Sequence, residues 1–172
     1  SQPGPQPARP AAMKKVLIID DDQFILKVYQ KKFETEGLVV EVAADGPAAL
    51  DTLRKSVPAL ILLDLMLPGM NGVELLGHIR TLPGCAEIPV IVFSHSFDEK
   101  LLDAARSAGA IQCLNKNSIS PNRLLEIVRA AMAMHPGLHL HRSLREMAAA
   151  QARIEATYAA APNLAAAYLS LS

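Results

Sequence analysis

A regular alternation of short apolar runs with helix-like segments constrains the fold of this chain more than any other feature. The segments between the runs carry apolar residues three and four positions apart, which is typical of amphipathic helices. Both patterns continue without interruption to about residue 134. The apolar runs predict strands at 15–19, 39–43, 59–63, 89–93 and 110–114.

Four of these five runs are almost continuously apolar, such as "ALILL" at 59–63. A strand of this kind is buried on both faces, as in a parallel sheet with helices on either side. The right-handed crossovers that join parallel strands leave few topologies open. The sequence therefore predicts a doubly wound α/β fold, with a five-stranded parallel sheet and a helical C-terminal extension.

Three segments with different composition indicate the domain organisation. Residues 1–12 are rich in proline and poor in apolar side chains, which predicts a disordered linker. Residues 13–134 carry the alternating pattern and form the predicted domain. Residues 135–172 begin with "HPGLHLH", a connector, and continue as an alanine-rich helical extension.

The overall charge and the cysteines exclude several classes of protein. Lys plus Arg equals Asp plus Glu at 17 each, which argues against a nucleic-acid binder and against a polybasic membrane binder. The apolar runs are too short to cross a bilayer, and the N-terminus has no signal-peptide pattern. Cys85 and Cys113 match no metal or disulfide spacing, as expected of reduced thiols. We expect a cytoplasmic protein without a membrane or nucleic-acid partner.

Polar side chains follow four of the predicted strands at their C-terminal ends. In a parallel sheet these ends meet at one edge, where ligands bind. Unshielded carboxylates that lie close together at such an edge repel one another, which raises the pKa of at least one of them. A divalent cation that prefers oxygen ligands, such as Mg²⁺, relieves that repulsion. Asp22 has a simpler interpretation as the N-cap of the following helix. The residues at this edge are Asp20, Asp21, Asp22, Asp64, Ser94 and Lys116.

The segments "LIIDDD", "LILLDLMLPGMNG", "PVIVFSHS" and "GAIQCLNK" together resemble the receiver domain of two-component response regulators. The resemblance covers residues 14 to about 134. It implies a flavodoxin-like sheet with strand order 2-1-3-4-5. It also implies a phosphoprotein in phosphorelay signal transduction, whose partners are a sensor histidine kinase or a histidine phosphotransfer protein and a downstream protein.

The resemblance also assigns roles to the residues at the sheet edge. Asp64 matches the phosphate-accepting aspartate, and Pro68 and Gly72 shape the turn that follows it. Ser94 matches the switch hydroxyl and Lys116 the lysine that binds the phosphoryl group. The implied Mg²⁺ ligands are Asp20, Asp21, Asp64 and the backbone carbonyl of Met66. Such a chain accepts and loses a phosphoryl group by its own catalysis and is not otherwise an enzyme.

Three positions depart from the receiver pattern. Cys113 stands where receivers commonly have an aromatic residue that moves with the switch hydroxyl. Asn117 follows Lys116 where proline is usual, commonly with a cis bond, and a non-proline cis bond costs about 3 kcal/mol. His95 replaces a small residue after Ser94; it either narrows the mouth of the site or is a solvated loop residue.

Two alternatives remain at this point. Hydrolases of the haloacid dehalogenase type also begin with strand-end aspartates, but their Asp-x-Asp-x-Thr/Val motif would place Phe24 at its last position. A receiver that binds partners without being phosphorylated is the second alternative: the intact acidic site argues against it, while Cys113 and Asn117 lend it some support.

The C-terminal extension carries an amphipathic pattern. Ser143 and Glu146 form a capping box, and apolar residues follow at helical spacing at 144, 147, 154 and 158. An isolated helix of this length needs a surface to cover its apolar face. That surface is the chain's own domain, a second copy or a partner, and the alanines favour a homodimer through residues 143–171.

Overall fold

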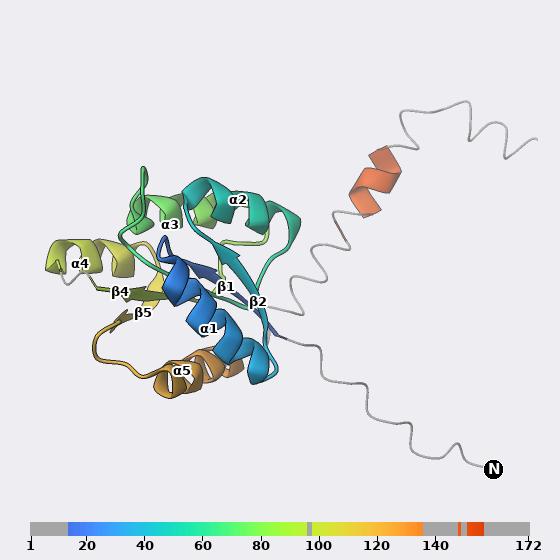
Figure 1. Cartoon of the computed structure of the whole chain (residues 1–172). Coiled ribbons are helices and arrows are strands. Elements are labelled where there is room, and N and C mark those ends of the chain that lie inside the picture. Colours follow the sequence, from blue (N-terminus) through green and yellow to red (C-terminus); the bar gives the residue numbers. More distant parts are fainter. Residues whose placement is uncertain (1–13, 96–97, 136–147, 149–150, 157–172) are drawn as a thin grey trace, which may run out of the picture.

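A computed structural model of the chain describes residues 14–95, 98–135, 148 and 151–156. Within these residues, one parallel sheet lies between two layers of helices (Figure 1). The strands are β1 (Lys15–Ile19), β2 (Val39–Ala43), β3 (Leu60–Leu63), β4 (Val90–Ser94) and β5 (Ala110–Asn115). The helices of the domain are α1 (Gln23–Thr35), α2 (Gly46–Lys55), α3 (Gly72–Thr81), α4 (Glu99–Ser107) and α5 (Pro121–Met134).

The strand order is β2-β1-β3-β4-β5, and every pair of neighbours is parallel. The predicted fold class and strand order are therefore confirmed. Ile19 of β1 is paired with Leu63 of β3, and the amide of Asp64 donates to the carbonyl of Ile19 at 2.9 Å. This register brings the residues that follow the two strands, Asp20 and Asp64, to neighbouring positions.

The apolar strands bury both faces because helices cover each side of the sheet. Along β1, Val16 and Ile18 belong to the core under α1 and α5, while Leu17 and Ile19 belong to the core under α2, α3 and α4. All four side chains are at most 2% exposed. Alternate residues thus enter two separate cores, which explains the continuous apolar runs.

Side chains cap the N-terminus of each of the helices α1 to α5. Asp22 caps α1 as predicted, and its Oδ1 accepts from the amides of Phe24 at 2.9 Å and Ile25 at 3.3 Å. The other N-caps are Asp45, Asn71, Asp98 and Ser120.

The beginnings of two strands differ by one residue from the prediction. β3 begins at Leu60 and β4 at Val90. Pro89 lacks an amide hydrogen and cannot donate to the sheet, although its carbonyl still accepts from Ile61 at 3.0 Å. At its other end β4 extends one residue beyond the prediction, because Ser94 is paired with Asn115 of β5.

β5 differs from the other strands in being a bulged edge strand. Val90 is paired with Ala110, and Ile91 with Gln112, so that Ile111 is the additional residue in the ladder. Ile111 and Gln112 are both exposed. The apolar run at 110–114 correctly predicted the strand but gave no indication of the bulge.

The described part of the C-terminal extension is short. Residues 151–156 are helical and exposed, and the side chain of Ile154 is 53% exposed. The other predicted tail residues, Ser143, Leu144, Glu146, Met147 and Tyr158, lie outside the described residues, as do residues 1–12. The domain limits 13–134 and 135–172 remain predictions, although α5 ends at Met134. Among the described helices, none is long and apolar enough to cross a bilayer.

Candidate functional site

Three carboxylates meet at the C-terminal edge of the sheet. Asp20 and Asp21 follow β1, Asp64 follows β3, and an oxygen of each lies within 4.8 Å of the others. Asp20 and Asp64 are 2% and 6% exposed, whereas Asp21 is exposed. The structure therefore brings together the three acidic residues that the sequence predicted as metal ligands.

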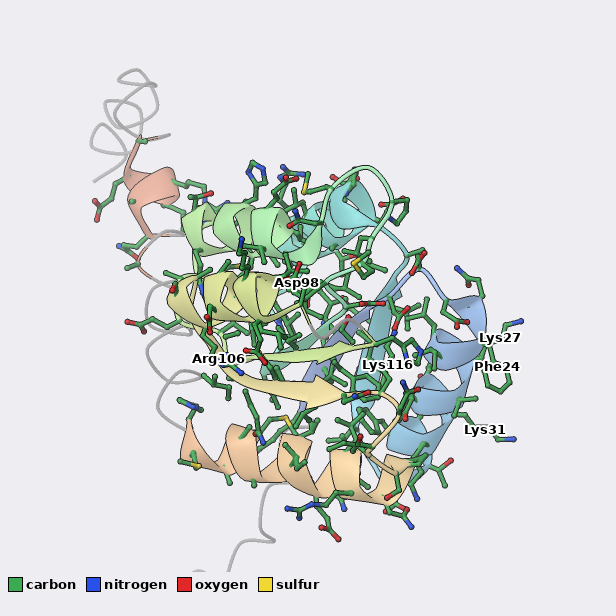
Figure 2. All side chains as sticks on the ribbon, turned by 90° about the vertical axis from the view of Figure 1, so that its left-hand side faces the viewer. Phe24, Lys27, Lys31, Asp98, Arg106 and Lys116 are labelled. Atoms are coloured by element: carbon green, nitrogen blue, oxygen red, sulfur yellow. The ribbon has the colours of Figure 1, made fainter. Side chains whose placement is uncertain are left out.

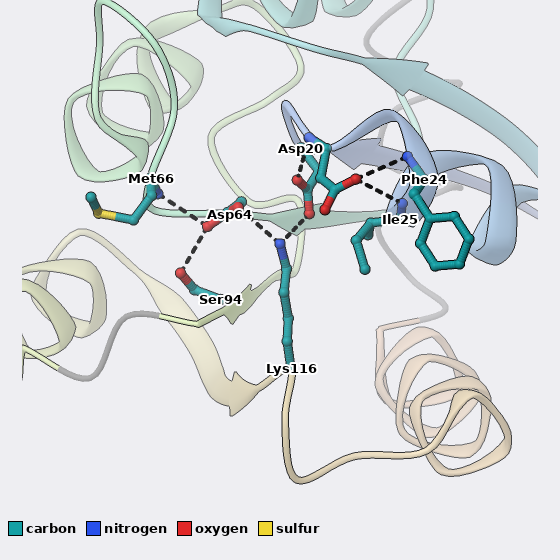
Figure 3. A network of polar contacts seen from close by, with 8 residues as sticks. Asp20, Phe24, Ile25, Asp64, Met66, Ser94 and Lys116 are labelled. Atoms are coloured by element: carbon teal, nitrogen blue, oxygen red, sulfur yellow. Dashed lines mark hydrogen bonds and ion pairs between the residues drawn. The ribbon is translucent and has the colours of Figure 1, made fainter.

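Lys116 lies between the two buried carboxylates (Figure 3). Its Nζ is 2.9 Å from Oδ2 of Asp64 and also donates to Oδ2 of Asp20. The lysine side chain is only 3% exposed. An ammonium in this position offsets much of the cost of burying two negative charges.

The other oxygen of Asp64 accepts two further hydrogen bonds. The hydroxyl of Ser94 donates to Oδ1 at 2.7 Å, and the amide of Met66 donates to the same oxygen at 3.0 Å. Ser94 is 1% exposed. Strands β3 and β4 and the end of β5 thus fix the carboxylate of Asp64 in one orientation.

Burial and charge act on the titration of Asp20 and Lys116. Burial is the largest influence on Asp20 and raises the pKa of its carboxyl above 3.8, although Lys116 and the amide of Asp22 oppose this. Burial alone would lower the pKa of Lys116, but its hydrogen bonds to Asp20 and Asp64 outweigh burial and raise it. Lys116 is therefore protonated throughout the physiological pH range.

The donor set fits a divalent cation. Three carboxylates against one ammonium leave a formal charge of about −2 when all are ionised, and hard oxygen ligands suit Mg²⁺. The site opens toward solvent on the side of Asp21, where a metal could keep bound waters. The residues present are thus compatible with the predicted ion.

Asp22 does not contribute to this cluster because its carboxylate caps α1. The second aspartate of a haloacid dehalogenase motif would have to be Asp22, so that alternative has no support here. Phe24, which occupies the last position of that motif, is 72% exposed.

The loop after β5 reaches the site without a cis peptide bond; the described residues contain none. Oδ1 of Asn115 accepts from the amide of Asn117 at 2.8 Å, and the amide of Lys116 donates to the carbonyl of Ser94 at 3.1 Å. These bonds hold Lys116 toward the carboxylates although proline does not follow it. The sequence prediction did not include Asn115, although its place two residues before Asn117 is compatible with such a turn.

Phe93 also supports the site, and the sequence prediction did not single it out. Nζ of Lys116 lies 5.9 Å from the centre of its ring, within the range of a cation–π contact. The ring of Tyr29 packs edge-on against the ring of Phe93, with 5.3 Å between the two ring centres. The sequence could have indicated this role, because successive side chains of a strand point to opposite faces of the sheet. With Ser94 at the site, the preceding residue, Phe93, must enter the core on the opposite face.

The two remaining departures from the receiver pattern lie at the edge of this region. Cys113 is partly buried, packs against the core under α2, α3 and α4, and burial raises the pKa of its thiol. His95 is exposed, as expected of a solvated loop residue. Neither side chain takes part in the hydrogen-bonded network around Asp64 described above.

Comparison with known proteins gives a consistent result. The family described as "Response regulator receiver domain" matches residues 16–129. The chain is 38% identical over 118 residues to protein-glutamate methylesterase/protein-glutamine glutaminase 5 of Myxococcus xanthus, which covers 66% of this chain and 33% of that protein. It is 34% identical over 126 residues to the Regulator of RpoS of Escherichia coli K12, covering 72% of this chain and 36% of that protein.

A solved structure shows the same fold. The response regulator receiver domain protein (CheY-like) from Methanospirillum hungatei JF-1 has a TM-score of 0.67 and 31% identity, over 72% of this chain and 96% of that one. The chain spans only about a third of the two curated relatives, so their remaining parts have no counterpart in this match. Together the matched residues, the sheet order and the carboxylate cluster show that this chain belongs to the response regulator receiver domain family.

Proposed function

We propose that this chain is a two-component response regulator in which Mg²⁺-dependent phosphorylation of Asp64 switches a protein-interaction surface. The observation that carries the proposal is the environment of Asp64. Its carboxylate accepts from Ser94 at 2.7 Å and from Lys116 at 2.9 Å, next to two further carboxylates. Asp20, Asp21, Asp64 and the carbonyl of Met66 would hold the ion.

The chemistry follows from this arrangement. Oδ2 of Asp64, which has a second lone pair besides the one that accepts from Lys116, attacks the phosphorus of a phosphodonor. A bond from oxygen to phosphorus forms, and the bond from phosphorus to the donor's leaving atom breaks with its electron pair. Mg²⁺ held by the carboxylates would neutralise charge on the transferring group, and the ammonium of Lys116 would neutralise further charge there.

The phosphorylated site differs from the free site in charge and in hydrogen-bond acceptors. The acyl phosphate brings about one additional negative charge and new acceptor oxygens to Asp64. Ser94 and Lys116, which now bond to the carboxylate, can turn to the phosphoryl oxygens. Both residues belong to the β4 and β5 side of the sheet, so their rearrangement biases the surface formed by α4 and β5.

The rim of the site supports a protein as the phosphodonor. Phe24 is 72% exposed and Met66 58% exposed, and they lie on opposite sides of the carboxylates (Figure 3). Lys27 and Lys31 project outward from α1 beside Phe24 (Figure 2). Apolar side chains ringed by charge are typical of protein-binding surfaces. A sensor histidine kinase or a histidine phosphotransfer protein is the proposed donor.

We propose a cytoplasmic protein that signals through a downstream protein partner and has no enzymatic activity beyond its own phosphorylation and dephosphorylation. The sequence predicts homodimerisation through residues 143–171, and nearly all of that segment lies outside the described residues.

A phosphorylation-independent scaffold is the second candidate. Cys113 favours it, because a partly buried thiol cannot report the state of Asp64 by swinging a ring between two positions. The ordered contacts around Asp64 favour phosphorylation instead.

Labelling with acetyl phosphate separates the two candidates. The wild-type chain in Mg²⁺ should gain the mass of one phosphoryl group, and Asp64→Ala or removal of Mg²⁺ with EDTA should abolish the gain. Asp51→Ala removes an exposed carboxylate and should label normally. Persistent labelling of Asp64→Ala, or a label that maps to Asp20, would refute the assignment, and an unlabelled wild type would support the scaffold.

A further inference from the structure

A groove of about 540 Å³ lies between the edge strand β5 and one face of α5. The α5 residues that line it recur three and four positions apart, so they form a second stripe beside the stripe that enters the core. Figure 2 shows α5 on the side of β5 that faces away from α4. The apolar lining consists of Ile111, Ile127, Ala130, Ala131 and Met134.

Two side chains of this lining are unusually exposed. Ile111 is 47% exposed because the bulge in β5 turns it out of the regular ladder, and Met134 is 78% exposed. A second cavity of about 420 Å³ shares Ile111 and His135 with this groove. Two neighbouring cavities with partly apolar linings therefore meet near the point where the chain leaves α5.

The C-terminal extension carries an apolar face that matches such a surface. With about 100° per residue, Leu144, Met147, Ile154 and Tyr158 would fall within about 80° of one another around a helix. Residues 151–156 are helical, and Ile154 is 53% exposed. Helices of this length gain most of their stability from packing such a face against another surface.

We propose that residues 143–158 occupy the groove between β5 and α5 of the same chain, as a helix antiparallel to α5. Residues 136–142 connect the two helices, and seven residues span up to about 24 Å. Packed helices are about 8–10 Å apart, so the connector is long enough. A helix of 16 residues is about 24 Å long, comparable with the 21 Å or so of α5. The two helices would form an αα-hairpin.

The chain's own extension has an advantage over a second copy as the occupant of this groove. A segment tethered by a connector of about seven residues experiences an effective concentration of about 1 mM at its binding site. A second copy at micromolar concentration would have to overcome a difference of about a thousandfold. The sequence left three surfaces open: the chain's own domain, a second copy and a partner. The groove favours the chain's own domain over a second copy, and therefore over the predicted homodimer.

Hydrogen–deuterium exchange on the full chain, combined with light scattering, tests this proposal. We expect amides in residues 143–158 to exchange about tenfold more slowly than in an unfolded peptide, at any chain concentration. Ile111→Glu and Ile154→Asp, at opposite sides of the contact, should each remove this protection. Ala156→Asp places the same charge about 160° from the centre of the apolar stripe and should preserve it.

The outcomes distinguish the occupants. A monomer whose protection depends on both Ile111 and Ile154 supports the proposal. Protection that increases with concentration together with a doubled mass identifies a second copy and overturns it. Rapid exchange throughout residues 143–158 in the wild type also overturns it. Because Ile111 is exposed and far in sequence from Asp64, phosphorylation by acetyl phosphate serves as the check that each variant is folded.

Discussion

The α-carbon of Gly72 lies directly against the backbone of Asp64. A β-carbon at Gly72 would be 2.5 Å from the carbonyl oxygen of Asp64 and 2.7 Å from the α-carbon of Leu65. The amide of Gly72 also donates to the carbonyl of Leu65 at 2.8 Å. This contact packs the start of α3 against the end of β3. Glycine is required here because there is no space for a β-carbon, and not because the backbone adopts an unusual conformation.

Gly72→Ala should therefore destabilise the domain by at least about 2 kcal/mol, because backbone atoms rather than flexible side chains must move. Gly77, also in α3, is the matched control, since a β-carbon there meets no atom within 4 Å. Gly77→Ala should stabilise the domain by about 0.5–1 kcal/mol through helix propensity. Urea unfolding followed by circular dichroism measures both changes, and equal effects would contradict the close contact.

Lys116→Met should destabilise the metal-free domain by about 3 kcal/mol, because it leaves two buried carboxylates without their counter-charge. Saturating Mg²⁺ should recover part of this loss by restoring positive charge. Arg123→Met, which removes an exposed ion pair with Glu126, should change stability by no more than about 0.5 kcal/mol. Thermal unfolding in EDTA and in Mg²⁺ checks both variants, and a Lys116→Met domain as stable as wild type in EDTA would argue against the buried pairs.

Asp20→Asn should stabilise the metal-free domain at pH 7 by about 1 kcal/mol, within the range common for stabilising substitutions, because asparagine has no charge to bury. Burial raises the pKa of Asp20 above its ordinary 3.8, so the folded state holds the proton more tightly. Stability from this group is present below pH 3.8 and is lost as the pH rises through the raised value. In the wild type the amide of Asp22 donates to Oδ1 of Asp20 at 2.9 Å. The side-chain oxygen of asparagine can still accept this hydrogen bond, and the asparagine does not lose stability as the pH rises.

The gain from Asp20→Asn should disappear or reverse when Mg²⁺ is added, since the variant lacks one predicted ligand. Asp51→Asn, at an exposed position, should show neither effect. Unfolding temperatures measured between pH 4 and 8 provide the comparison. A less stable Asp20→Asn in EDTA would mean that the pair with Lys116 outweighs the cost of burial.

Cys113→Tyr should change the affinity of the phosphorylated chain for its downstream partner more than it changes the rate of phosphorylation. Cys113 packs on the α4 side of β5 and makes no contact described above with Asp64. We expect labelling by acetyl phosphate to stay within about twofold of wild type, because the groups that stabilise the transferring charge are unchanged. A large, equal effect on labelling would place this residue in the chemistry itself.

The sheet and the acidic site were predictable because both depend on local pattern and topology. Continuous apolar runs such as 59–63 reveal strands buried on two faces, and parallel topology brings Asp20 and Asp64 to the same edge. The roles of Ser94 and Lys116 came from resemblance to a family, since a single hydroxyl or lysine carries no such information.

Other features depend on tertiary contacts that no local pattern encodes. Arg80 is an example: its guanidinium donates to the carbonyls of Ile88 at 2.7 Å and Gly109 at 3.1 Å, joining α3 to the beginnings of β4 and β5. The bulge at Ile111 is another, because an isoleucine within an apolar run reads as an ordinary strand residue. The turn at Asn115 is a third example, because the hydrogen bond from the amide of Asn117 to Oδ1 of Asn115 orders the loop where receivers usually have a proline.

The bulge at Ile111 also has a consequence for self-association through strand addition. β5 is an edge strand, and a flat edge offers its unpaired amides and carbonyls to any other extended chain. A bulge bends and twists the strand, so an incoming strand cannot follow it in register for more than a few residues. An otherwise exposed, isoleucine-bearing edge is thereby a poor template for aggregation, even in variants whose C-terminal extension has been removed.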